Sequence, residues 1–383
     1  MPFDSRRTLF IGSDVYRRAA YGAMHPLAIP RVETAFDIVR DLGWMPAERF
    51  RPSPVAPRDL LTRFHSDDYV AALARVGATG RAEIADRERF GLGSMENPAF
   101  LGVFERASTS VGGSYAAAGL ALDGRAVFHP AGGTHHGQPG RASGFCYFND
   151  PVFAVLGFLD AGFTRVAYVD LDAHHGDGVE DAYADDSRVL TVSIHEAGRF
   201  PGTGALDDAR SGRAVNLPVP RGLNDDEWRR LIAAAVLPIV GGFAPQAIVV
   251  TCGADPLAAD PLSAMDLSNV AIWDAVESLV RIAPRAVVLG GGGYNPWTLA
   301  RLWAGVWGRL AGFALPDRLP EASRARLAVL DCDLVDDEDR DPRWFERLDD
   351  LPRPGPLRPE IEAMIDTVRA RFDLGRPPFP HLA

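Results

Sequence analysis

Aspartate and histidine side chains are concentrated at the end of one apolar segment, VAYVDLDAHHGDG, residues 166–178. Side chains alternate between two faces of an extended chain, so Asp170, Asp172 and His174 point to the same side. Two buried carboxylates without a partner would cost several kcal/mol, and a bound cation removes that cost. A strand end that caps the next helix explains an isolated D-x-D better, but the attached histidines favour a metal site.

A second group of imidazoles lies in the glycine-rich segment HPAGGTHHGQPG, residues 129–140. Adjacent histidines on a strand would face opposite ways, whereas on a glycine-rich loop His135 and His136 can both turn toward one site. Taken alone, this pair is better explained as an exposed loop or as imidazoles bonded to backbone carbonyls. The pair does not occur alone, because five of the nine histidines fall between residues 129 and 175: His129, His135, His136, His174 and His175.

Two further segments carry candidate groups. TCGADPLAADPL places Asp255 directly after an apolar run and Asp260 five residues later. Asp255 can be a third metal ligand or a helix cap, since Pro256 is compatible with a helix start. In GGGGYNPW the phenol of Tyr294 can hydrogen-bond a developing oxyanion. A phosphate-binding glycine loop is the alternative, but no lysine follows and the spacing is not G-x-x-x-x-G-K-[ST].

The elements that must position these groups are short apolar runs rich in β-branched or aromatic residues. Their length and their polar ends predict buried strands that run into loops, at residues 125–130, 165–172, 188–196, 247–255 and 285–294. Helical spacing between them predicts helices at 97–122, 149–163 and 225–243, the second capped by Asn149 or Asp150. This alternation predicts an α/β fold with a parallel sheet, helices on both faces and a ligand site beyond the carboxyl ends of the strands.

Composition excludes several classes of protein. The 383 residues are 47% hydrophobic and 24% charged, as expected for a globular protein with a substantial core. The net charge of −11, without a single lysine, argues against a nucleic-acid partner. Three scattered cysteines without a C-x-x-C predict neither disulfides nor a zinc–thiolate cluster and fit a reducing cytoplasm. Because there is no signal-like start and no apolar run of about 18 residues, we expect a cytoplasmic protein without a membrane partner.

The end of the chain differs in composition from the rest. Residues 333–359 are acidic and then proline-rich, which predicts an extended surface segment before a final helix near 360–372. We expect one domain over residues 1–383, with a core at about 8–315 and an extension at 316–383 that packs on it.

In their order along the chain, five segments closely resemble the histone deacetylase family: GGTHHGQPGRASGFCYFND, VDLDAHHGDGVEDAY, VSIHEAGRFPGTG, GADPLAADPL and GGGGYN. The resemblance extends from residue 8 to about 315, and YGAMHPLAIPRV and GSMENPAF look most like the bacterial acetoin utilization proteins. It implies a three-layer arginase/deacetylase fold with a mainly parallel sheet of about eight strands. It also implies one Zn²⁺ and the removal of an acetyl or other acyl group from an amine such as acyl-lysine.

The resemblance assigns roles to matching residues. The zinc ligands would be Asp172, His174 and Asp255, which leave a coordination position open. His136 would take a proton from water, while His135 supports the site as a charged partner. The full set of implied catalytic residues is His135, His136, Tyr294, Asp170 and Asp177. A structural K⁺ or Na⁺ would be held by Asp170, Asp172, His174, Ser193 and Ile194.

The implied substrate-binding residues form a narrow tunnel for an acylated stem: Glu96, Gly144, Phe145, Phe200, Leu262 and Gly293. Three positions depart from the family pattern or match it loosely. Glu96 stands where the family usually has an aspartate, Pro256 replaces a small or polar residue, and Arg31 matches an arginine below the active site.

Other functions stay open at this point. The substrate can be an acylated protein or peptide, an acetylpolyamine or another small metabolite. A non-catalytic acyl-lysine binder and a two-manganese ureohydrolase are more remote alternatives. A homo-oligomer is an alternative to a monomer.

Overall fold

The computed structural model describes residues 4–18 and 21–374. Its centre is one sheet of eight strands in the order β2-β1-β3-β8-β7-β4-β5-β6, and every neighbouring pair is parallel. The predicted parallel α/β architecture is therefore confirmed. The strands are β1 (Leu9–Gly12), β2 (Phe50–Pro52), β3 (Ala126–His129), β4 (Val166–Asp170), β5 (Val189–Glu196), β6 (Ala214–Val219), β7 (Ala247–Thr251) and β8 (Ala286–Leu289).

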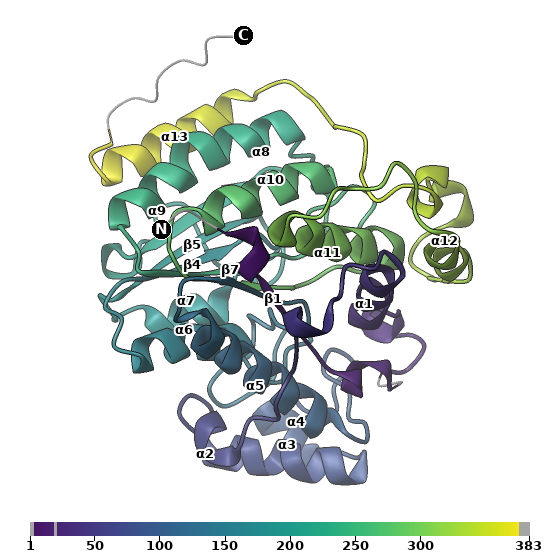
Figure 1. Cartoon of the computed structure of the whole chain (residues 1–383). Helices are drawn as coiled ribbons and strands as arrows, with labels where there is room; N and C mark the ends of the chain where they lie inside the picture. The colour runs from purple at the N-terminus through teal and green to yellow at the C-terminus, as the bar shows by residue number, and fades with distance from the viewer. Residues whose placement is uncertain (1–3, 19–20, 375–383) are drawn as a thin grey trace.

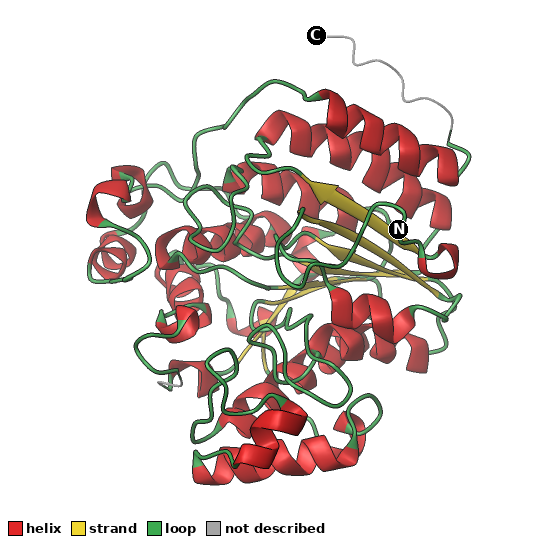
Figure 2. Ribbon diagram, turned by 180° about the vertical axis from the view of Figure 1, so that it is seen from behind, coloured by secondary structure: helices red, strands yellow, loops and turns green. Residues whose placement is uncertain are grey.

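Helices cover both faces of this sheet (Figures 1 and 2). The larger core on one face includes residues of α1 (Val32–Asp41), α8 (Asp225–Leu231), α9 (Leu237–Phe243), α10 (Asn269–Val280), α11 (Pro296–Ala311), α12 (Glu321–Ala328) and α13 (Pro359–Arg371). The opposite face packs on α5 (Val103–Ala121), α6 (Asp150–Asp160) and α7 (Asp177–Tyr183). A smaller cluster beside α5 contains α2 (Arg58–Leu61), α3 (Asp67–Thr79) and α4 (Ile84–Phe90).

Shorter helical segments connect these elements. A π-helical turn, Ile232–Val236, joins α8 to α9. Single 3-10 turns occupy Ser5–Arg7, Asp14–Arg17, Pro26–Ala28, Ala47–Arg49, Arg210–Gly212, Asp337–Asp339 and Pro342–Phe345. In the part of the chain that is described, no helix has both the length and the apolar character needed to cross a bilayer.

The central strands β3, β4, β7 and β8 are buried on both faces, which explains their nearly continuous apolar sequences. In β7, Ile248 and Val250 belong to the core with α10 and α11, whereas Ala247 and Val249 belong to the core with α5 and α6. A strand covered on both sides is apolar at nearly every position, so it shows no alternation of polar and apolar residues. The run AIVVT in this strand follows that rule.

The predicted elements agree with the structure, with small shifts at their ends. Strands begin or end within a few residues of the predicted limits, and residues 225–243 form one continuous helical segment. The N-cap of α6 is Asn149, whose side chain accepts a hydrogen bond from Val152 N–H. Helix α5 begins only at Val103, because Gly102 before it has a φ of 82°. The final helix lies where it was expected, as α13.

The C-terminal part packs against the larger core. The ring of Trp344 stacks on that of Trp297 at the start of α11, with ring centroids 6.2 Å apart. Arg301, fully buried in α11, donates to Asp350 at 2.5 Å. Residues 351–358 then run without regular structure to α13, as the proline-rich composition predicted.

Candidate active site

The carboxyl ends of four neighbouring strands, β3, β8, β7 and β4, supply the candidate site. The histidine pair follows β3, Tyr294 follows β8, Asp255 follows β7, and the DLDAHH segment forms the end of β4 and the loop after it. Parallel strands end at the same edge, so groups far apart in sequence meet there. This location is the one predicted for a ligand site.

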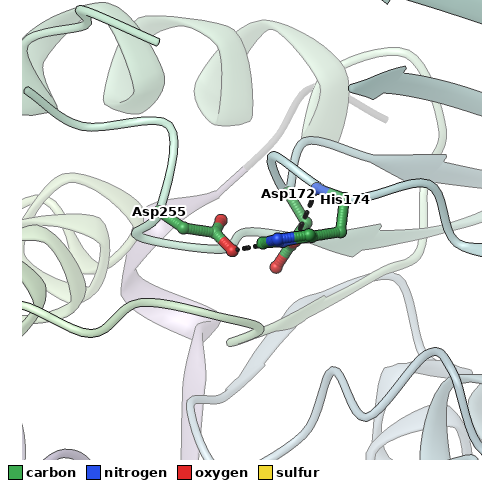
Figure 3. A group of neighbouring side chains, drawn as sticks. All are labelled: Asp172, His174 and Asp255. Atoms are coloured by element: carbon green, nitrogen blue, oxygen red, sulfur yellow. Dashed lines mark hydrogen bonds and ion pairs between the residues drawn. The ribbon is translucent and has the colours of Figure 1, made fainter. Parts of the chain in front are cut away.

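Asp172, His174 and Asp255 converge at this edge. His174 Nδ1 lies 3.2 Å from Asp172 Oδ1 and 2.9 Å from Asp255 Oδ2. One donor atom from each residue lies within 4.8 Å of the others. Figure 3 shows the three side chains pointing toward one another, with the imidazole next to both carboxylates. Asp255 does not cap a helix, because the next helix, α10, begins at Asn269.

Glycines allow the backbone to approach these carboxylates closely. A Cβ on Gly253 would lie 2.2 Å from Asp172 Oδ2, and one on Gly292 would lie 2.2 Å from Asp255 Oδ2. The N–H of Gly292 donates to Asp172 Oδ2 at 2.6 Å. The glycine run therefore encloses the acidic pair, and this explains it without a phosphate-binding function.

These residues fit a divalent cation. Asp172 and Asp255 are fully buried, and among the described residues their carboxylates accept hydrogen bonds from backbone N–H groups and from His174. His135 Nε2 lies 3.8 Å from Asp172 Oδ1, and no arginine pairs with either carboxylate in the described part of the chain. Burial and the neighbouring Asp172 carboxylate raise the pKa of Asp255 above its ordinary value. A cation would relieve this repulsion. Two carboxylates and one imidazole form the donor set of a catalytic zinc site, which keeps a position open.

The two imidazoles after β3 are held by separate carboxylates. His135 Nδ1 lies 2.7 Å from Asp170 Oδ2, and His136 Nδ1 lies 2.7 Å from Asp177 Oδ1. Because a carboxylate accepts hydrogen bonds, both histidines carry a proton on Nδ1, and Nε2 of a neutral His136 is left as an acceptor. The structure thus brings together the predicted histidine and aspartate pairs.

The two histidines have opposite pKa shifts. Burial lowers the pKa of His135, but the carboxylates of Asp170 and Asp172 outweigh it and raise the value to about 9. Burial and the charge of His135 lower the pKa of His136 to about 4, against the effect of Asp177. At neutral pH the pair therefore holds one charged and one neutral imidazole.

Partners of these aspartates were missed in the sequence. Tyr168 Oη donates to Asp170 Oδ2 at 2.6 Å, and Gln138 Nε2 donates to Asp177 Oδ2 at 3.1 Å. Tyr168 lies two residues before Asp170, on the same face of β4, so strand periodicity could have indicated it. No comparable signal pointed to Gln138.

The Tyr294 loop is fixed by an aspartate and an arginine. Asp260 Oδ2 accepts from Tyr294 N–H at 2.7 Å, so Asp260 positions the tyrosine. Arg31 donates to the carbonyls of Gly291 at 2.6 Å and Gly293 at 3.2 Å. Gly293 thus contacts Arg31 through its carbonyl.

A pocket of about 350 Å³ leads from the surface to these groups, and its lining residues are Glu96, His136, Gly144, Phe145, His174, Arg199, Phe200, Leu262 and Tyr294. The ring of Phe200 stands edge-on to His136 at 5.0 Å. Gly144 has a φ of 55°, and a Cβ there would lie 2.4 Å from His136 Cδ2, so only glycine fits. Arg199, paired with Glu196 at 2.9 Å, is a lining residue that the sequence did not indicate.

Glu96 lies at the pocket but has a partner within the chain. Its carboxylate accepts a hydrogen bond from Gly144 N–H. The carbonyl of the same residue lies 3.1 Å from His25 Nε2, and the His25 ring contacts Phe145. Glu96 is therefore bound to the Gly144 segment of the pocket wall and also contacts His25.

The model of the histone deacetylase domain matches residues 25–310. The chain belongs to the histone deacetylase family. Acetoin utilization protein AcuC of Bacillus subtilis is 33% identical over 331 residues, covering 82% of this chain and 85% of that protein. Histone deacetylase RPD3 of Saccharomyces cerevisiae is 35% identical over 329 residues, covering 83% and 75%.

Solved structures support the same family. The crystal structure of a histone deacetylase homologue from Aquifex aeolicus superposes with a TM-score of 0.91 at 34% identity, covering 94% of this chain and 99% of that one. A histone deacetylase homologue in complex with SAHA gives a TM-score of 0.90 at 33% identity and the same coverage. With the eight-stranded parallel sheet, these matches confirm the predicted arginase/deacetylase fold.

The residues predicted to bind a monovalent cation also lie together. Asp170 in β4 pairs in register with Ser193 in β5, and Ile194 follows. Ser193 Oγ lies 2.9 Å from His195 Nδ1. Occupation of this place by K⁺ or Na⁺ stays a prediction.

Proposed function

We propose that the protein is a zinc-dependent amidohydrolase that removes an acetyl or other acyl group from an amine such as acyl-lysine. The observation that carries this proposal is the pocket between Phe145 and Phe200, which leads to His136, His174 and Tyr294. Aromatic walls suit a slender apolar stem, and the polar groups at its inner end suit a carbonyl and a water molecule. Membership in the histone deacetylase family supports the same chemistry.

The protonation state of each side chain determines its role in the proposed reaction. Zinc held by Asp172, His174 and Asp255 would polarise the amide carbonyl and acidify a water molecule. His136, neutral and bonded through Nδ1 to Asp177, accepts the water proton at Nε2 and later delivers it to the leaving amine. Charged His135 stabilises the negative charge that develops, and the phenol of Tyr294 donates to the oxyanion.

The proposal is tested with Tyr294→Phe. Loss of one oxyanion donor costs about 10²-fold or more in kcat, so we expect a drop of this size on an acetyl-lysine peptide with zinc content unchanged. Tyr115→Phe is the matched control, because the Tyr115 hydroxyl bonds Asp160 outside the pocket. Near-wild-type turnover by Tyr294→Phe removes the phenol from the mechanism. Failure of the zinc-loaded wild type on every acyl amine contradicts the proposed function.

Metal stoichiometry separates this proposal from a two-manganese ureohydrolase. Within residues 4–18 and 21–374, Asp172, His174 and Asp255 form the one group of three or more such side chains close enough to share a metal ion. We propose one divalent ion per chain. Turnover of acetyl-lysine peptides, acetylpolyamines and longer acyl-lysines, compared side by side, would identify the substrate class.

A further inference from the structure

The loop that carries His135 and His136 is held by two consecutive residues at the start of α6. Asn149 and Asp150 are both fully buried. They contact the backbone on each side of the histidine pair, within residues 133–137. Neither touches the pocket, and neither was assigned a catalytic role above.

The carboxylate of Asp150 accepts hydrogen bonds from the backbone N–H groups that precede the histidines. Its Oδ2 accepts from Gly133 N–H at 3.1 Å, and its Oδ1 accepts from Thr134 N–H at 2.8 Å. The hydroxyl groups of Ser114 and Thr134 also contact its two oxygens. A carboxylate has about four acceptor positions and no donor, so it matches this set of groups.

Asn149 binds the backbone carbonyls of the following residues. Its Nδ2 donates to His135 O at 3.0 Å and to Gly137 O at 2.9 Å. Its own N–H donates to His65 Nε2 at 3.1 Å, and His65 Nδ1 lies 3.0 Å from Gln138 O. The amide of Asn149 and the carboxylate of Asp150 thus bind complementary backbone groups of one short loop.

The loop is also pressed against this pair. A Cβ on Gly137 would lie 2.8 Å from Asn149 N, and one on Gly132 would lie 2.6 Å from Asp150 Oδ2. Glycines permit the close approach, but they also leave the loop free to take other backbone conformations. The side-chain hydrogen bonds of the pair restrict that freedom.

We infer that Asn149 and Asp150 are positioning residues that set the place of His135 and His136 for the proposed hydrolysis. The inference rests on that proposed function. A displacement of about 1 Å can cost roughly 10²-fold in rate, so the loss of either set of contacts should lower kcat. Substrate binding should change less than kcat, because neither Asn149 nor Asp150 lines the pocket.

The experiment separates positioning from helix capping. Asn149→Ser keeps a good N-cap residue but loses both Nδ2 donors, and Asp150→Asn places an amide where two backbone N–H groups need acceptors. Asp160→Asn makes the same change at the far end of α6, where the carboxylate contacts Arg63. We expect kcat on the acyl amine that the wild type hydrolyses to fall roughly 10- to 100-fold in the first two variants, with KM within about twofold, and to stay unchanged in the third.

Zinc content and urea unfolding are measured for every variant, so that kcat refers to folded, metal-loaded protein. Wild-type kcat in Asn149→Ser and Asp150→Asn overturns the inference but leaves the proposed function intact. A loss of activity that is fully explained by a loss of metal or of folded protein also overturns the inference and leaves the proposed function intact. An inactive wild type instead contradicts the proposed function itself.

Discussion

Asp172 and Asp255 are buried carboxylates whose negative charge is compensated by few groups of the chain. Backbone N–H groups and one imidazole satisfy some of their oxygen atoms. Burial and the neighbouring Asp172 charge favour the protonated form of Asp255. A cation at this place would therefore stabilise the ionised forms and the folded chain together.

Removal of one ligand should abolish metal binding. Asp255→Asn keeps the shape of the side chain and removes its charge, so we expect metal affinity to fall by more than the roughly 10- to 100-fold that the loss of an outer partner costs. Zinc per chain after dialysis against a weak chelator measures this, with exposed Asp207→Asn as the control. Full zinc retention by Asp255→Asn would exclude this residue as a ligand.

Residues of the site differ in how far the sequence could reveal them. Asp172 and His174 follow a buried strand and belong to a cluster of aspartates and histidines. The sequence alone therefore indicates their role as possible metal ligands. Gln138 and Arg199 reach the site only through tertiary contacts, and a single glutamine or arginine in a loop has no distinguishing pattern. The sequence indicated Asp260 as a candidate group. Its hydrogen bond with Tyr294 N–H could not be predicted, because it depends on the distance between two loops.

At the scale of elements, α11 begins directly after the Tyr294 loop and packs tightly on α10. Asn295 caps α11 directly after Tyr294. Gly305, in the middle of this helix, lies against the indole of Trp273 from α10, and a Cβ on Gly305 would lie 1.9 Å from Trp273 Cζ2. The small residue sets the separation of the two helices.

Gly305→Ala should destabilise the fold. Overpacking in a filled core costs about 1–3 kcal/mol, and we expect the free energy of unfolding in urea to fall by that amount. Gly241→Ala is the control, because a Cβ there meets nothing within 4 Å and alanine is favoured in helices. Equal stability of both variants would contradict this view of the α10–α11 contact.

The elements that were predicted and those that were missed differ in length and composition. The strands next to the site are buried runs of β-branched residues and were predicted within a few residues. β2 has three residues, FRP, and β6 contains Pro218, which weakens a strand pattern. Both are edge strands, where proline is tolerated, so their assignment depends on neighbours that a local pattern does not contain.

At the scale of the whole molecule, residues 316–374 extend along the outside of the larger core and end in α13. Arg358, before α13, pairs with the buried carboxylate of Glu227 in α8 at 2.6 Å. This ion pair joins the extension to the helical layer over the sheet. It supports our proposal of one domain over residues 1–383.

This ion pair should make stability depend on pH. Burial raises the pKa of Glu227, but hydrogen bonds from Arg358 and Asn224 N–H outweigh it and lower the value. A lowered pKa in the folded state gives stability that is fully present above the unfolded value of about 4.3 and is lost as the pH falls through the folded value. Glu227→Gln should therefore be less stable than wild type at neutral pH.

The stability gap between wild type and Glu227→Gln should narrow on acidification. Urea unfolding of both proteins from about pH 7 to about pH 3.5 measures it. Glu338→Gln, at an exposed position of the same extension, serves as the control. A gap that stays constant over this range would show that the ionisation of Glu227 does not stabilise the extension.

The neighbouring position of β4 and β7 has a consequence for how the protein matures. Strands β5 and β6 and helices α7, α8 and α9 separate them in the chain, yet the two strands are paired in the sheet. A nascent polypeptide that stops before Asp255 lacks one carboxylate of the proposed metal site. Cofactor acquisition would then await closure of the middle of the sheet, and metal content would report how many copies in a preparation have completed folding.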